Sequence, residues 1–359
     1  MFGPSEKSEK GVSIYTTDLA DAIRKNNVDV DLITWKIWSF LSFLKAIPKL
    51  RKYDVIHFQH EFGMFGYTGI IFVPLMIILG LFKKGKIVTT FHTVYRKDEK
   101  ILSNLKVLSW LKRLIVQPRH SKLIDNFSSA VIVHTEFLKE DLYERTKIDW
   151  NKINVIPHGV RENVLKFNKN AAKKELGIKG PLYLFIGYIA PVKGVDILLK
   201  YAKHIGKTIA IVGSAPGMIR QNYIKGLYEY IKENKIEKYL HIYIDENFDS
   251  RGRLWWVYCS AADLILMPYQ KMTTSGIFIN AMESRKPVVS SDSKYFHEIA
   301  EDYGCVKIVK KDEDYPKVIK ASMKQLKKME AEAKRFAIDN SLNNIAKKHI
   351  YLYDSIIKH

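Results

Sequence analysis

The chain has 359 residues, which is too long for one hydrophobic core of ordinary size and about right for two α/β domains. Hydrophobic residues make up 47% of it and aromatic residues 12%, which excludes an intrinsically disordered chain. The net charge of +20 favours anionic partners such as nucleic acid, acidic lipid headgroups or phosphorylated substrates, and it carries no information about the fold.

The cysteine content and the first residues bear on location. Only Cys259 and Cys305 occur, which excludes a disulfide framework and is typical of a reducing compartment. Residues 1–10 contain no apolar signal-peptide core. We therefore expect a cytoplasmic protein.

The first half alternates short apolar runs with amphipathic stretches, the pattern of βα units on a parallel sheet. We expect a helix over residues 11–25, and strands over residues 28–34, 54–60, 86–91, 130–133 and 153–156. A doubly wound domain usually opens with a buried strand, yet only Met1 and Phe2 precede Gly3. Either that strand is absent or the start of the sequence is assigned late.

Residues 67–82 form an apolar run that is shorter than the roughly 20 residues needed to span a bilayer, and it contains Pro74. A helix buried under the sheet is the first interpretation, and a helix that dips into a membrane is the second.

Residues 96–122 are strongly basic, and their apolar residues recur at helical spacing. A basic amphipathic helix of this kind lies on anionic membranes, with an interfacial tryptophan as a further anchor. The membrane-contact candidates are Lys106, Trp110, Lys112, Arg113 and Arg119. A solvated helix face over the core is the alternative, and nucleic acid is a poorer explanation because no recognised nucleic-acid module is present.

The second half repeats the plan. Strands are expected over residues 182–188, 208–213, 240–245, 263–267, 287–291 and 306–309, with helices near 194–205, 217–234, 251–261, 275–284 and 294–302. Residues 157–159 with the polar stretch 163–174 are predicted to link the halves, and the tail from Tyr315 is predicted to be helical with a break near residues 339–341.

Two segments of the second half are candidate phosphate sites. Lys193 and Gly194 lie in a loop between an apolar strand and a helix, where free N–H groups and the positive end of the helix dipole favour anions. Ser275 and Gly276 open another helix after the strand at 263–267, at the sheet edge where open α/β sheets bind ligands. The alternatives are an exposed lysine and a simple helix cap.

Histidines mark the first half. His92 follows a predicted strand, where a packing or capping role is the alternative to a functional one. His57 and His60 are three residues apart in a strand, so they point to opposite faces and do not form a metal pair. We expect no metal site.

Eight segments follow one another in a recognisable order: GPSEKSEKGVSIYTTDLADAI (3–23), VIHFQHEFGMFG (55–66), TTFHTV (89–94), VIVHTEFLKEDL (131–142), INVIPHGV (153–160), FIGYIAPVKGVDILL (185–199), TSGIFINAM (274–282) and KPVVSSD (286–292). In this order they resemble the GT-B glycosyltransferases, specifically the retaining family 4 group that includes mannosyl- and glucosyltransferases. The resemblance covers nearly the whole chain, and its QHEFG and FHT pair is similar to members described as mannosyltransferases.

The resemblance implies an α/β, GT-B fold with two facing Rossmann-like domains and a nucleotide sugar between them. Residues 1–160 would form the acceptor-side domain, joined by a returning C-terminal helix at 336–359, and residues 161–335 the nucleotide-sugar-binding domain.

The resemblance also implies roles for individual residues. Lys193 would hold the donor diphosphate, and backbone amides near Ser275 and Gly276 would cradle it. His92 would contact the donor sugar, and Gly11 would lie in the loop beneath it. His60 and Glu61 are the acceptor-side candidates.

The sequence departs from the family pattern at three positions. The usual Glu-x7-Glu pair corresponds to Met272 and Asn280, and the usual arginine after the strand glycine corresponds to Tyr188. Asn280 can still hydrogen-bond a ribose, whereas Met272 cannot replace an acidic contact. These departures are typical of a subgroup built on Ser-Gly.

We therefore expect a retaining hexosyltransferase that uses a nucleotide sugar, needs no metal or other cofactor, and acts on a lipid-linked or glycan acceptor at the inner face of the membrane. Lysine and helix-end amides would stabilise the leaving diphosphate. The alternative is a non-catalytic GT-B-like protein that binds a nucleotide sugar or a partner.

Overall fold

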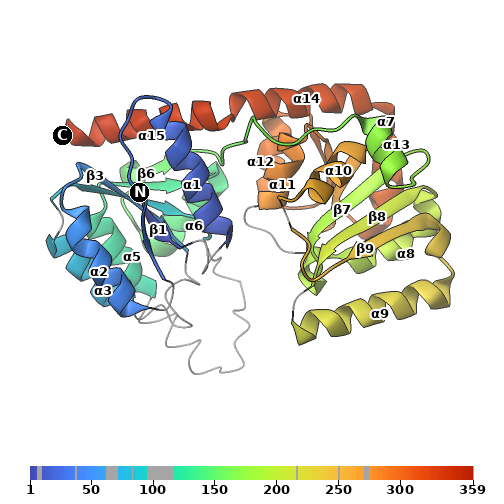
Figure 1. Cartoon of the computed structure of the whole chain (residues 1–359), viewed down its shortest axis with the longest axis horizontal. Helices are drawn as coiled ribbons and strands as arrows, with labels where there is room; N and C mark the ends of the chain where they lie inside the picture. Colours follow the sequence, from blue (N-terminus) through green and yellow to red (C-terminus); the bar gives the residue numbers. More distant parts are fainter. Residues whose placement is uncertain are drawn as a thin grey trace. The chain divides into compact units, whose positions relative to one another are not determined.

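The computed structural model describes residues 1–5, 10–36, 39–61, 72–82, 84–94, 117–215, 217–249, 251–270 and 275–358. They form two compact units. Unit 1 comprises Met1–Gly159 and Leu342–His359, and unit 2 comprises Val160–Ser341. Each unit holds a six-stranded parallel sheet flanked by helices (Figure 1), so the predicted α/β fold with two domains is confirmed.

The sheet of unit 1 has the strand order β2-β1-β3-β4-β5-β6. Its strands are β1 (Phe2–Pro4), β2 (Ile33–Trp35), β3 (Val55–His60), β4 (Lys86–Phe91), β5 (Ala130–Val133) and β6 (Ile153–Val155). Its helices are α1 (Lys10–Arg24), α2 (Phe40–Leu50), α3 (Phe72–Phe82), α5 (Gln117–Phe127), α6 (Glu136–Thr146) and α15 (Leu342–Ile357), with the 3-10 turn η3 (Trp150–Lys152).

The opening strand, expected to be absent or cut short, is present as β1. Phe2, Gly3 and Pro4 pair in parallel with β2, and Phe2 also pairs with Phe58 of β3. Three residues suffice because neighbours hold β1 on both sides, and the buried Phe2 ring packs against aromatic rings of β2, β3 and α2.

The strand predicted over residues 28–34 is shorter than expected and begins at Ile33. The residues before it form a loop, because the Arg24 guanidinium at the end of α1 donates two hydrogen bonds to the Val30 carbonyl oxygen, at 2.8 and 2.6 Å. That carbonyl therefore does not take part in the sheet.

The apolar run at 67–82 is helical over α3, and residues 67–71 lie outside the described part of the chain. Met76 and Leu79 are fully buried in the core of unit 1, in accord with a helix packed on the sheet. No helix among the described residues is long and apolar enough to cross a membrane.

The C-terminal helix belongs to unit 1, as predicted. α14 (Leu326–Asp339) lies in unit 2, and after the break at residues 340–341 the helix α15 packs against α1. Ile345 and Leu352 are buried there beside Leu19 and Ile23, and the hydroxyl of Tyr353 lies 2.6 Å from Nδ1 of His57.

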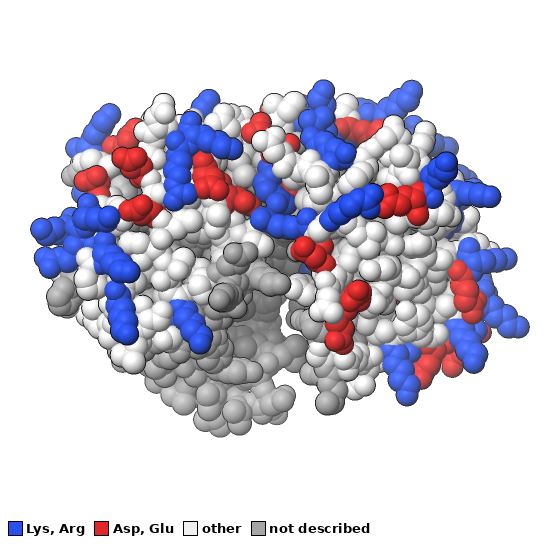
Figure 2. Space-filling model, viewed as in Figure 1, with Lys and Arg blue, Asp and Glu red and all other residues white. Residues whose placement is uncertain are grey.

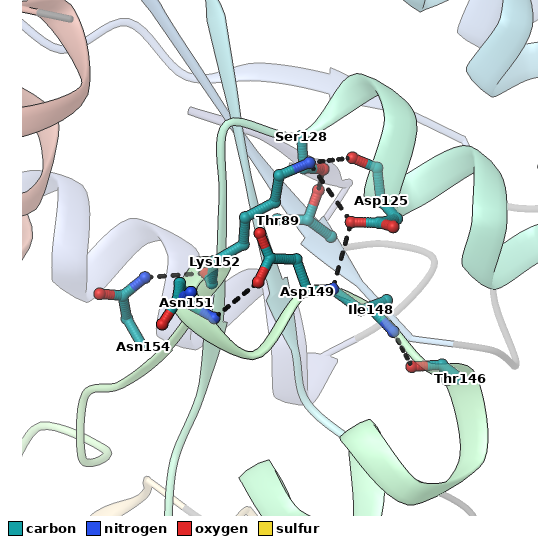
Figure 3. A network of polar contacts seen from close by, with 9 residues as sticks. All are labelled: Thr89, Asp125, Ser128, Thr146, Ile148, Asp149, Asn151, Lys152 and Asn154. Atoms are coloured by element: carbon teal, nitrogen blue, oxygen red, sulfur yellow. Dashed lines mark hydrogen bonds and ion pairs between the residues drawn. The ribbon is translucent and has the colours of Figure 1, made fainter.

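A polar network holds the amino-terminal ends of β5 and β6 (Figure 3). The Lys152 ammonium donates to the backbone carbonyl oxygen of Asp125 at 2.7 Å and to its carboxylate at 3.3 Å. Thr89 and Ser128 share a hydrogen bond of 2.8 Å between their hydroxyls. The Lys152 contacts join α5 to η3 at the sheet edge opposite to the carboxyl ends of the strands, and the hydroxyl pair joins the residue after α5 to β4.

The sheet of unit 2 has the order β12-β11-β10-β7-β8-β9. Its strands are β7 (Leu182–Tyr188), β8 (Thr208–Ser214), β9 (Leu240–Ile244), β10 (Leu264–Met267), β11 (Val288–Ser291) and β12 (Val306–Val309). Its further helices are α7 (Lys169–Glu175), α8 (Val195–Ile205), α9 (Met218–Asn234), α10 (Arg253–Ala261), α11 (Gly276–Glu283), α12 (Lys294–Asp302) and α13 (Tyr315–Lys324), with 3-10 turns η4 (Pro191–Lys193), η5 (Glu237–Tyr239) and η6 (Asp312–Asp314).

The stretch 163–174, predicted as a polar linker, contains the start of α7. The Asn168 side chain caps this helix, and α7 packs against α10 within unit 2. Lys169 and Lys173 both pair with the buried carboxylate of Asp263, at 2.5 and 2.6 Å. The polar composition reflects these ion pairs, which sequence periodicity does not show.

Candidate functional site

Lys193 lies at the carboxyl edge of the sheet of unit 2. It ends the turn η4, which follows β7, and α8 begins two residues later. Its side chain is half-buried, and its ammonium lies 3.8 Å from the centre of the Tyr269 ring. Burial lowers the pKa of Lys193 to about 8, so the group is still mostly a cation at pH 7.

Backbone contacts hold the Lys193 loop against the segment that follows β10. The Gln270 N–H donates to the Val192 carbonyl oxygen at 3.0 Å. Gly194 has a φ of +67°, and a Cβ there would lie 1.9 Å from the Pro268 carbonyl oxygen. Only glycine permits this approach, which brings Lys193 over Tyr269.

Tyr269 connects Lys193 with the amino end of α11. Its ring is buried beneath the lysine, and its hydroxyl shares a side-chain hydrogen bond with Ser275. Ser275 caps α11 by accepting from the Phe278 N–H at 3.2 Å. The structure therefore brings together the two segments that the sequence identified as candidate phosphate sites.

Gly276 occupies the first position of α11 and leaves space above the helix end. A Cβ at this residue would meet no atom of the described residues within 4 Å, so packing among them does not require glycine here. Free N–H groups of the first helical turn and the positive end of the dipole favour an anion at such a place. A mostly protonated lysine and an open helix end form a site suited to a diphosphate.

The remaining candidates of unit 2 surround this site. Asn280 lies one turn after Gly276 on α11 and is half-buried, whereas Tyr188 at the end of β7 is 55% exposed. Met272 lies outside the described residues. The nearby carboxylate of Glu283 is buried and forms a two-point pair with Arg161, at 2.6 and 2.8 Å, so it has a structural role.

In unit 1, His92 follows the carboxyl end of β4 and takes part in a buried hydrogen-bond chain. Its Nε2 lies 2.8 Å from Oε1 of Gln59, and Nε2 of Gln59 lies 3.2 Å from Nε2 of His57. An amide oxygen only accepts, so His92 carries its proton on Nε2. Burial, with the nearby His134 and His158, holds the pKa of His92 well below its usual range, so the ring is neutral at pH 7.

A cluster of rings surrounds His92. Tyr15 of α1 contacts His92 at 5.0 Å between ring centres, His134 at 5.6 Å and His158 at 4.6 Å. Burial also lowers the pKa of His134. The cluster joins the Tyr15 ring to the neutral imidazoles of His92 and His134 at the carboxyl edge of the sheet, which suits contact with an uncharged polar group.

The other candidates of unit 1 differ in their surroundings. His60 is fully buried, and its ring lies against Phe91 with ring centres 4.7 Å apart. Glu61 is partly exposed and accepts a hydrogen bond from the Thr93 hydroxyl at 2.6 Å. Gly11 was expected in a loop, but it lies within the first turn of α1, which begins at Lys10.

Most of the membrane-contact candidates lie in a part of the chain that the structure does not describe. Lys106, Trp110, Lys112 and Arg113 lie outside the described residues, and Arg119 lies in α5 with its side chain not described.

Sequence reasoning missed Tyr269, Gln59 and Tyr15 as members of these sites. Tyr269 directly follows the apolar strand β10 and Pro268, and Gln59 is a polar residue in an otherwise buried strand. The buried side-chain amide of Gln59 was the signal in the sequence, because both its carbonyl oxygen and its NH₂ group need hydrogen-bond partners.

Two sequence-family models together match most of the chain. The sequence model of Glycosyltransferase Family 4 matches residues 34–164, and that of Glycosyl transferases group 1 matches residues 167–341. Only residues 1–33, 165–166 and 342–359 are unmatched. No protein with a curated description matches the sequence significantly.

Solved structures share the fold over nearly the whole chain. HepE of Anabaena in complex with UDP superimposes with a TM-score of 0.74 at 15% identity, covering 99% of this chain and 98% of HepE. A glycosyltransferase of Rickettsia africae matches with 0.73 at 18% identity, covering 100% and 98%. Sucrose-phosphate synthase of Thermosynechococcus elongatus matches with 0.73 at 16% identity, covering 97% and 94%.

Proposed function

Since the chain belongs to the glycosyltransferases of the GT-B fold, we propose that it moves a hexose from a nucleotide sugar to a lipid-linked or glycan acceptor, with retention of configuration. The observation that carries this proposal is the junction of Lys193, Tyr269 and the open helix end at Gly276 in unit 2. The structures of HepE with UDP and with UDP-glucose support a nucleotide-sugar donor.

The diphosphate of the donor binds at this junction. Lys193 places a cation beside the phosphate oxygens, and the α11 amides donate to them, so the negative charge that develops on the leaving diphosphate is stabilised without a metal ion. Asn280 hydrogen-bonds the ribose, and Tyr188 lies where a second phosphate cation is usual in the family.

Transfer with retention then proceeds by attack on the same face of the sugar. The acceptor hydroxyl oxygen forms the new bond to the anomeric carbon while the bond from that carbon to the diphosphate oxygen breaks. The acceptor proton passes to an oxygen of the leaving diphosphate. This scheme requires no carboxylate nucleophile, so it is compatible with Met272 and Asn280 in place of the family's glutamates.

In unit 1, neutral His92 contacts the donor sugar. Its position is fixed through Gln59 and His57, which α15 holds by the Tyr353 hydroxyl. His60 and Glu61 are the acceptor-side residues, and Gly11 lies beside the sugar in the first turn of α1.

The absence of the glutamate pair favours a second candidate, a GT-B-like protein that binds a nucleotide sugar without transfer. Screening UDP-, GDP- and ADP-sugars for thermal stabilisation identifies the donor, because binding to the folded state raises its stability. Slow donor hydrolysis by the purified protein then separates the two candidates. Stabilisation without any nucleotide release would support the binding protein, and no stabilisation by any donor would contradict both.

A further inference from the structure

A basic groove runs along α2 and the sheet edge at β2 in unit 1. Its volume is about 1220 Å³, and its lining includes residues from the loop before β2, from α2 and from the segments before β3 and β4. Five cations line it, namely Lys45, Lys49, Arg51, Lys52 and Lys84.

The charge of this groove is unbalanced. Asp31 is the single acidic residue of its lining, and the Lys52 ammonium at 3.3 Å and the Tyr53 hydroxyl both contact its carboxylate. Lys45, Lys49 and Lys84 are exposed. A concave surface with this excess of cations attracts anions of a partner.

Exposed apolar side chains lie on α2, which lines the groove, and on the neighbouring α3. Leu41 of α2 is 68% exposed and also lines the groove, and Leu81 of α3 is 72% exposed. α2 and α3 pack against each other at one side of unit 1 (Figure 1). Figure 2 shows Lys and Arg side chains over the part of unit 1 where Figure 1 draws these helices.

We propose that this basic groove, with Leu41 and Leu81, is a docking surface for an anionic lipid bilayer. A bilayer offers negative headgroups to the cations and an acyl boundary to the leucines, which is the combination that surface-bound helices use. Nucleic acid would match the cations but not the exposed leucines. The surface is independent of the nucleotide-sugar site and of the transfer reaction.

The docking surface leaves the site of unit 1 open. Arg51, Lys52 and Lys84 precede β3 and β4, whereas His92 and Glu61 follow the carboxyl ends of those strands. A bilayer held at the basic end of the groove therefore contacts the edge of the sheet opposite to His92, so of the two acceptor classes proposed above this docking favours a glycan over a lipid anchored in the same bilayer.

Vesicle co-sedimentation of the full chain tests the proposal. The variant Lys45→Gln, Lys49→Gln, Lys84→Gln is compared with a control of equal charge change on exposed residues of unit 2, Lys232→Gln, Lys310→Gln, Lys320→Gln. The vesicles contain phosphatidylglycerol in phosphatidylcholine, or phosphatidylcholine alone. Since each basic residue near an anionic surface contributes about a factor of five to binding, we expect the groove variant to lose about 100-fold and the control less than threefold.

Two further measurements separate the apolar contribution to vesicle binding from the electrostatic one, and vesicle binding from catalysis. Leu41→Ser with Leu81→Ser should weaken vesicle binding without changing its dependence on salt, because these residues act through apolar contact. Donor hydrolysis should stay unchanged in all variants, so a failed docking surface is distinguishable from a failed enzyme.

Three outcomes would overturn the proposal. They are equal losses in the groove variant and the control, absence of wild-type binding to phosphatidylglycerol vesicles, and displacement of the protein from vesicles by millimolar inorganic phosphate at constant ionic strength. The last result would show that the groove takes a free anion instead of a lipid surface.

Discussion

At the residue scale, Lys193 is the cation that Tyr269 connects with the amino end of α11. In the proposed function, Tyr188 replaces the second cation of the usual family pattern, so the removal of Lys193 would leave the departing diphosphate with helix amides alone. The half-buried position and the tyrosine ring beneath it hold the ammonium in one place. A fixed cation stabilises a developing negative charge better than a mobile surface cation does.

We expect Lys193→Ala to lower turnover by about 100-fold or more, comparable to the loss of one oxyanion donor. The loss of turnover is measured by steady-state kinetics with the donor that thermal screening identifies. Lys200→Ala on the exposed side of α8 is the matched control and should stay at the wild-type rate. Turnover of Lys193→Ala within threefold of wild type would remove this role from Lys193.

Gly276 permits a test that separates binding from folding. A Cβ there meets no atom of the described part of the chain within 4 Å, so Gly276→Val should leave the melting temperature nearly unchanged. The added side chain occupies the space of the diphosphate, and such overpacking costs about 1–3 kcal/mol, which weakens donor binding by about tenfold to a hundredfold.

The matched control for this test is Gly226→Val. Gly226 lies inside α9, and a Cβ there also meets no atom within 4 Å. Titration calorimetry with the donor compares the two variants. Equal affinities for both would mean that the end of α11 binds no phosphate.

At the scale of elements, hydrophobic patterning predicted most strands and helices, because buried parallel strands are continuous apolar runs. β7 matches its predicted range, whereas β1 and β2 do not. Three-residue strands are stabilised by neighbours distant in sequence, and no local pattern identifies them. In the same way, Lys193 and Gly276 were visible from their loops, but Tyr269 joins them only after β7 and β10 have become neighbours.

The basic segment 96–122 supplies the element-scale prediction. Neutralising Lys106, Lys112, Arg113 and Arg119 together should weaken binding to anionic vesicles by several hundredfold, at about 1 kcal/mol for each residue. The loss should shrink as salt rises, because exposed charges are screened beyond roughly 8 Å at physiological ionic strength.

Co-sedimentation at two salt concentrations measures this effect, with donor hydrolysis as the control for folding. Trp110→Ala should weaken binding in a way that salt does not reproduce, since an interfacial ring contributes through burial. Equal sedimentation of wild type and the fourfold variant would show that this segment is solvated surface, and a soluble acceptor would then be the better proposal.

At the scale of the whole molecule, the two units differ in their buried histidines. Burial is the main cause that lowers the pKa of His57, His92 and His134, and it lowers the pKa of His60 to about 3 and that of His349 to about 4. All five belong to unit 1. In unit 2, His241 is the histidine whose pKa burial lowers among the described residues.

This asymmetry predicts that acid destabilises unit 1 before unit 2. Below the usual histidine pKa of about 6.5 the unfolded chain binds protons that folded unit 1 excludes, so the free energy of unfolding falls as pH falls. Each such histidine contributes up to about 1.4 kcal/mol per pH unit, from about pH 6.5 down to its folded pKa. Above about pH 7 the histidines are neutral in both states, and this dependence vanishes.

Hydrogen exchange followed by mass spectrometry at pH 7 and pH 5, corrected for the intrinsic rate, measures the two units separately. Peptides from β3, β4 and α15 should lose protection at pH 5, whereas peptides from β7, β8 and α8 should change little. His57→Gln removes one titrating group, while the amide still offers a donor and an acceptor to Tyr353 and Thr90. This variant should therefore show a smaller loss of protection in unit 1 between pH 7 and pH 5. If both units lose protection at the same pH and to the same extent, then protonation of the buried histidines does not control the acid stability of unit 1.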